Sequence, residues 1–92
     1  MIQAFEKITV SDTAVELDVE KYKAGEEKAN KATITVEDAS IRFLSNGIIP
    51  TSTVGHLIPA GALITLETYN EIQHFHAIRA TGSDAVIQVS YL

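Results

Sequence analysis

The chain has 92 residues, twelve of them acidic and seven basic, with a net charge of −5 and no cysteine. This length fits one domain over residues 1–92, whose core is thin enough to gain stability from assembly with other chains. The composition excludes disulfides and cysteine-based metal sites, and the acidic balance argues against nucleic acid, whose phosphates bind basic faces.

The N-terminal segment Met1–Val10 contains Gln3, Glu6 and Lys7 and no apolar run, so we expect no signal peptide. No segment approaches the ~20 consecutive apolar residues that a membrane-spanning helix needs. We therefore expect no membrane partner.

Alternation of apolar and polar residues is the dominant pattern along the chain. Near the N-terminus, for example, Val15, Leu17 and Val19 fall on one face of a strand. The predicted strands are residues 5–10, 15–19, 32–37, 40–44, 54–58, 63–67, 76–80 and 85–91. Turn residues separate them about every ten residues, which is typical of sandwiches and barrels. The sequence therefore predicts an all-β fold, an antiparallel and jelly-roll-like β-sandwich of about eight short strands.

Three segments interrupt this alternation. Residues 20–31 are highly charged and contain Tyr22 as their only large apolar residue, which predicts an exposed loop, with a helical turn over Ala24–Ala32 as the alternative. Residues 45–53 contain an Asn-Gly turn and a proline, and they predict a loop or an edge segment. Residues 70–75 predict the only helical turn of the chain, with Asn70 as its N-cap.

Two histidines form a His-x-His pair, His74 and His76. If both lay on one strand they would face the same side and could share a metal, with His56 or Glu71 as a third ligand. The pair by itself is a weak motif. We therefore favour two rim histidines that flank the core residue Phe75, and we predict no metal site.

Catalytic patterns are missing from the sequence. Ser83, His56 and Asp84 are the residue types of a triad, but no nucleophile elbow holds the serine. Ser83 and Asp84 belong to a turn over residues 81–84, where their types are expected for structural reasons. No glycine-rich phosphate loop is present either. We predict a protein without catalytic residues or cofactors.

Two arginines lie inside apolar strands, Arg42 between Ile41 and Phe43, and Arg79 after Ile78. Each is expected either to pair with an acid such as Glu37 or Asp84, or to face a neighbouring subunit, where arginine is enriched.

The second half of the chain carries an ordered set of short motifs. They are Ile41-Arg42-Phe43, Gly47, Pro50-Thr51, Gly55-His56, Ala60-Gly61, Phe75, Ala77-Ile78-Arg79 and a last strand that ends near Tyr91. In order and spacing, residues 32–92 resemble a group of small structural proteins of tailed bacteriophages and prophages.

This resemblance implies a non-enzymatic subunit of the virion, a capsid decoration protein or a head-tail accessory protein. The subunit would be made in the bacterial cytoplasm, assemble with copies of itself and bind other virion proteins. Loops on a rigid sandwich carry recognition, so we expect contacts at the proline-containing loop and at residues 20–31. The candidate interface residues are Arg42, Pro50, Thr51 and Arg79.

Two other functions remain open. A carbohydrate-binding or ligand-binding module would need exposed aromatic residues, for which the sequence offers Tyr22 and Tyr69 but no tryptophan. A small metal-dependent enzyme of cupin-like shape would need three or four converging ligands, of which His74 and His76 would be two.

Overall fold

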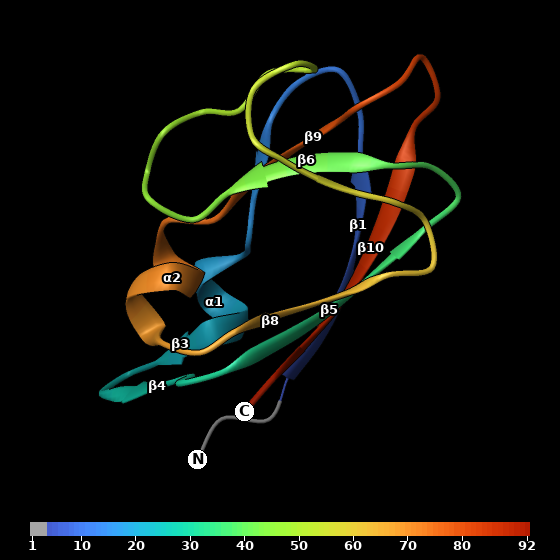
Figure 1. Cartoon of the computed structure of the whole chain (residues 1–92). Helices are drawn as coiled ribbons and strands as arrows, with labels where there is room; N and C mark the ends of the chain where they lie inside the picture. The colour runs from blue at the N-terminus through green and yellow to red at the C-terminus, as the bar shows by residue number, and fades with distance from the viewer. Residues whose placement is uncertain (1–3) are drawn as a thin grey trace.

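The computed structural model describes residues 4–92, which form strands in two layers with two one-turn helices at one end (Figure 1). The elements in chain order are β1 (Ala4–Val10), β2 (Val15–Glu16), α1 (Val19–Tyr22), β3 (Lys23–Ala24), β4 (Glu27–Lys28), β5 (Ala32–Glu37), β6 (Ile41–Leu44), β7 (His56–Ile58), β8 (Leu63–Leu66), α2 (Tyr69–Gln73), β9 (His76–Arg79) and β10 (Ala85–Tyr91).

Eight strands build two four-stranded sheets, in the orders β1-β10-β5-β8 and β2-β9-β6-β7, and β3 and β4 form a separate hairpin. All neighbouring strands are antiparallel. Within the eight, the first pairs with the last, the second with the seventh, the third with the sixth and the fourth with the fifth. The chain is thus a long hairpin wrapped into two sheets, which is the jelly-roll arrangement.

The core lies between the two sheets and follows the alternation of the sequence. In β10, Ala85, Ile87, Val89 and Tyr91 are buried, while the intervening side chains face outward. Ile34 and Val36 of β5 are buried beside them. These central strands have neighbours on both sides, so they carry the most regular burial pattern in the molecule.

The predicted all-β sandwich is confirmed, and the strands predicted at 32–37 and 85–91 have the observed limits. Strand β2 is shorter than predicted because the Asp18 side chain accepts a hydrogen bond from the Glu20 amide and begins a helix. Val19 is therefore half exposed, and the prediction that it shares the inner face with Val15 and Leu17 is wrong.

Residues 20–31 are more ordered than the predicted exposed loop. They contain α1 and the β3-β4 hairpin, and the Ala29 amide donates to the Tyr22 carbonyl at 2.8 Å. Tyr22 and Ala29 are buried, and they hold this charged segment against the sandwich.

The second helix, α2, confirms the predicted helical turn but not its cap. Thr68, and not Asn70, is the N-cap, because its hydroxyl accepts a hydrogen bond from the Glu71 amide at 3.1 Å. The structure therefore has two short helices where the sequence predicted one. Within residues 4–92, neither helix is long and apolar enough to cross a membrane.

Candidate binding surface

Arg42 ties a long loop to the outer face of the second sheet. Its register partners across the sheet are Leu57 and Ile78, on the face opposite the buried Ile41. The guanidinium donates from Nε to the Ser52 carbonyl at 3.0 Å and from Nη1 to the Gly55 carbonyl at 2.9 Å. One side chain thereby fixes two points of the loop between β6 and β7.

The expected pairing of Arg42 with Glu37 does not form. Glu37 accepts a hydrogen bond from Gln88 at 2.8 Å instead. Arg42 is satisfied by main-chain carbonyls, an arrangement that a pattern of charged residues cannot indicate.

Pro50 and Gly55 seat this loop on the sheet. Pro50 is less than 2% exposed, so this candidate interface residue packs inward and supports the loop. Gly55 has a φ of 126°, and a Cβ at this position would lie 3.2 Å from the Phe43 carbonyl oxygen and 3.2 Å from the Pro50 Cβ. A side chain here would adopt a backbone conformation that L residues rarely take, and Phe43 and Pro50 would have to move by a few tenths of an ångström.

Thr51 closes a tight turn near the β7 end of the loop. Its amide donates to the Val54 carbonyl at 2.9 Å, and its hydroxyl accepts from the Val54 amide at 3.0 Å and from the Thr53 amide at 3.3 Å. At the other end of the loop, the Gly47 amide donates to the His74 carbonyl at 3.2 Å. The loop is therefore hydrogen-bonded along its length, although it has no regular secondary structure.

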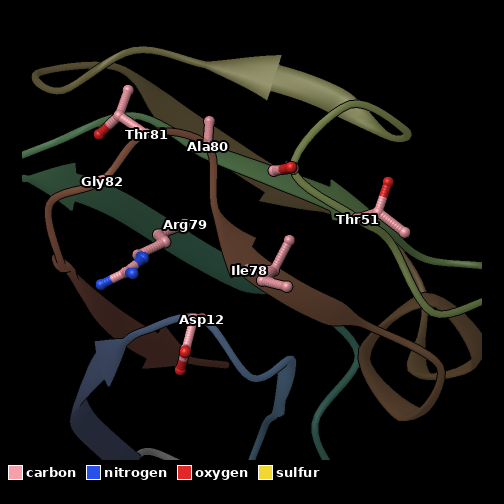
Figure 2. A pocket seen from close by; sticks show the side chains of 8 residues that line it. Asp12, Thr51, Ile78, Arg79, Ala80, Thr81 and Gly82 are labelled. Atoms are coloured by element: carbon pink, nitrogen blue, oxygen red, sulfur yellow. The ribbon is translucent and has the colours of Figure 1, made fainter.

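A pocket of about 580 Å³ lies beside this loop (Figure 2). Thr51 and Ser52 line it from the loop, Asp12 lines it from the β1-β2 turn, and the end of β9 and the residues after it complete the lining. The remaining lining residues are Ile78, Arg79, Ala80, Thr81 and Gly82. The structure therefore brings together Thr51 and Arg79, two of the four interface candidates, while Arg42 and Pro50 support the loop next to them.

The pocket combines both charges with hydroxyl groups. Arg79 pairs with Asp84 through Nη1 at 2.7 Å, which confirms that predicted partner. In the view of Figure 2, Asp12 and Arg79 lie to one side of Ile78, and Thr51 lies to the other. Such a surface can bind polar groups through charge and hydrogen bonds, and Ile78 adds an apolar side chain to its lining.

A row of exposed apolar side chains on this loop and on β7 was not among the predicted interface residues. Ile48, Ile49, Val54 and Leu57 are each more than half exposed. A signal for them is present in the sequence, because residues 39–66 contain Arg42 but no aspartate, glutamate or lysine. A long stretch with a single charged residue and several exposed apolar residues is a sign of an interaction surface.

The two histidines do not share a strand. His74 follows α2 as its C-cap, and β9 begins at His76. The His76 ring is engaged on both nitrogens, with Nε2 at 3.0 Å from Glu16 and Nδ1 at 3.3 Å from the His74 carbonyl. Among residues 4–92, no group of three or more histidine, cysteine or acidic side chains is placed to hold a metal ion.

The tyrosines proposed as exposed aromatic residues are part of the packing. Tyr22 is only 6% exposed and contacts the rings of Tyr69 and Tyr91, while Lys28 lies over the half-buried Tyr69 ring at 5.1 Å. The Tyr91 hydroxyl donates to Glu6 at 2.5 Å. Burial, and then this hydrogen bond, raise the pKa of Tyr91 well above its ordinary range. The prediction that Tyr22 is available for ligands is wrong.

The chain was compared with protein-family models, with curated proteins and with solved structures, and nothing matched in any of the three comparisons.

Proposed function

We propose that this chain is a non-enzymatic structural subunit of a tailed-phage virion, a capsid decoration or head-tail accessory protein that acts through protein–protein contacts. The observation that supports this proposal best is where the motifs of the resemblance lie. Arg42, Pro50, Thr51 and Gly55 build one anchored loop, and Arg79 lies at the pocket beside it.

A loop anchored in this way is suited to recognition. Its carbonyls, turn and proline are fixed before any partner arrives, so binding loses little loop entropy. The pocket residues Asp12, Arg79 and Thr81 offer a carboxylate, a guanidinium and a hydroxyl to a partner surface. We therefore place the contact with other virion proteins at the pocket and the adjoining turn at Thr51 and Ser52.

Co-sedimentation of the purified chain with phage particles tests this function. We expect the chain to sediment with particles induced from the bacterium that encodes it, and the variant Ser52→Arg to lose this binding because its side chain fills the pocket. Ser90→Arg is the matched control, since Ser90 is exposed on the outer face of the other sheet. A chain that stays in the supernatant, or a Ser90→Arg variant as defective as Ser52→Arg, would contradict the proposal.

A second candidate, a module that binds a carbohydrate or another small polar ligand, is favoured by one observation. The same pocket combines hydroxyls and charges with the aliphatic side chain of Ile78, and a sugar ring presents both kinds of surface. A glycan array that shows binding sensitive to Ser52→Arg, without binding to particles, would select this function over the first.

A further inference from the structure

Exposed apolar side chains concentrate in one part of the molecule. Eight large hydrophobic residues are exposed among residues 4–92, and five of them lie in the stretch 39–66, which contains no acidic residue. Four of these five lie on the β6-β7 loop and on β7. They form what we term the 48–57 patch: Ile48, Ile49, Val54 and Leu57. The fifth, Leu63, lies on β8 in the other sheet.

The patch is free of acidic residues, although the chain as a whole is acidic. All twelve aspartates and glutamates lie outside residues 39–66. The one charged side chain of this stretch, Arg42, is held by two loop carbonyls. Two copies of a chain with a net charge of −5 repel each other where their acidic residues meet, and the segment 39–66 brings no carboxylate of its own to such a contact.

The size of the patch matches what a stable contact needs. Its four side chains are 54–57% exposed. Summed over the four residues, the exposed surface is on the order of 400 Å², comparable in area with the largest apolar patch of a typical monomer. A standard interface buries about 800 Å² on each partner, of which a little more than half is apolar. The patch therefore supplies most of the apolar area that one side of such an interface requires.

We propose that a second copy of this chain covers the 48–57 patch. A surface that fits the patch must itself be apolar and must place no carboxylate against it, and the patch of another copy meets both conditions. The loop is already fixed by Arg42, Pro50 and the Thr51 turn, so two copies meet as preformed surfaces. This proposal extends the assembly role proposed above, and it leaves the pocket at Asp12 and Arg79 to other virion proteins.

The test is the molar mass of the full chain by size-exclusion chromatography with light scattering, over a wide range of concentration. We expect an oligomer that Leu57→Asp reduces to the mass of one chain. Leu63→Asp is the matched control, because Leu63 is 59% exposed and also lies in an edge strand, but outside the patch. It should keep the oligomer.

Ile49→Asp in the loop is a second variant, so that the test does not depend on Leu57→Asp alone if that variant folds poorly. Circular dichroism checks the fold of each variant. A wild-type chain that is monomeric at every concentration overturns the proposal. So does an oligomer that survives Ile49→Asp, or one that Leu63→Asp also dissolves. Particle binding by a monomeric chain would refute self-association alone, while an oligomer that ignores particles would refute the virion role alone.

Discussion

At the scale of single residues, the two arginines have different importance for stability. Arg42 is half-buried and donates to two carbonyls that have fixed positions in the loop, whereas Arg79 pairs with a half-exposed aspartate. A hydrogen bond from a charged donor contributes more than a surface ion pair, which solvent screens.

We predict that Arg42→Lys lowers the free energy of unfolding by about 1–3 kcal/mol, since an ammonium group cannot reach both carbonyls in the planar geometry of a guanidinium. Arg79→Lys serves as the control and should cost less than about 1 kcal/mol. Urea unfolding of the two variants measures the difference. Equal effects would mean that Arg42 does not hold the loop.

Tyr91 makes the free energy of unfolding depend on pH in the alkaline range. Its pKa is raised from 10.0 by burial and by the hydrogen bond to Glu6, and burial also raises the pKa of Tyr22. In the unfolded chain both tyrosines ionise near pH 10, while in the folded chain their raised pKa values move ionisation to higher pH. The stabilisation is therefore complete below pH 10 and is lost as the pH rises beyond it.

We expect the contribution of the two tyrosines to the free energy of unfolding to be constant below pH 10 and to fall as the pH rises above 10. In Tyr91→Phe the fall should be shallower, because one of the two linked groups is gone, and the variant should be less stable at neutral pH by about 1 kcal/mol. Urea unfolding on both sides of pH 10 measures both effects. An unchanged slope in the variant would count against the role of Tyr91.

At the scale of elements, the loop between β6 and β7 depends on Gly55. We predict that Gly55→Ala lowers the free energy of unfolding by about 1–3 kcal/mol, because the left-handed backbone and the close contacts to Phe43 and Pro50 both oppose a side chain. Gly82→Ala is the control, since a Cβ there meets nothing within 4 Å. Thermal unfolding of the pair is the measurement, and equal melting temperatures would be inconsistent with a loop seated in this way.

The segment of α1 and the β3-β4 hairpin depends on Tyr22. Although it carries Lys21, Lys23 and Lys28, we predict that trypsin cuts the wild-type segment slowly, because the buried Tyr22 ring fixes it against Tyr69 and Tyr91. Tyr22→Ala should be cut rapidly, and Tyr22→Phe, which keeps the ring, should resist. Rapid cleavage of the wild-type chain would show that this segment is not held.

The sequence predicts the limits of the central strands better than those of the helices and of the hairpin. Strands β5 and β10 were predicted to the residue because both are central strands whose alternation directly reflects burial. The N-termini of the two helices were not predicted correctly. The N-caps Asp18 and Thr68 depend on local hydrogen bonds that several nearby residues could form equally well. The β3-β4 hairpin was missed because residues 20–31 contain too few apolar residues to show a pattern.

At the scale of the whole molecule, the candidate site was only partly accessible from the sequence. Arg42, Thr51 and Arg79 could be named because they stand out in apolar or loop segments. Asp12 could not, since the fold brings it to the pocket from a distant turn. The acceptors of Arg42 are main-chain carbonyls, which have no sequence signal at all.

The jelly-roll topology presents two chemically different surfaces on the loop between β6 and β7. The anchored loop presents apolar side chains at Ile48 and Ile49 and a polar pocket beside Thr51. The apolar surface would join copies of the chain, and the pocket would bind the particle. A small sandwich with a thin core would gain stability from either contact.

The most direct test of the proposed virion role is quantitative mass spectrometry of gradient-purified phage particles produced by the organism that encodes the chain. We predict that the chain is present in a fixed ratio to the major capsid protein and remains after repeated purification. A chain that is abundant in the lysate but absent from the purified particles would contradict the virion role directly.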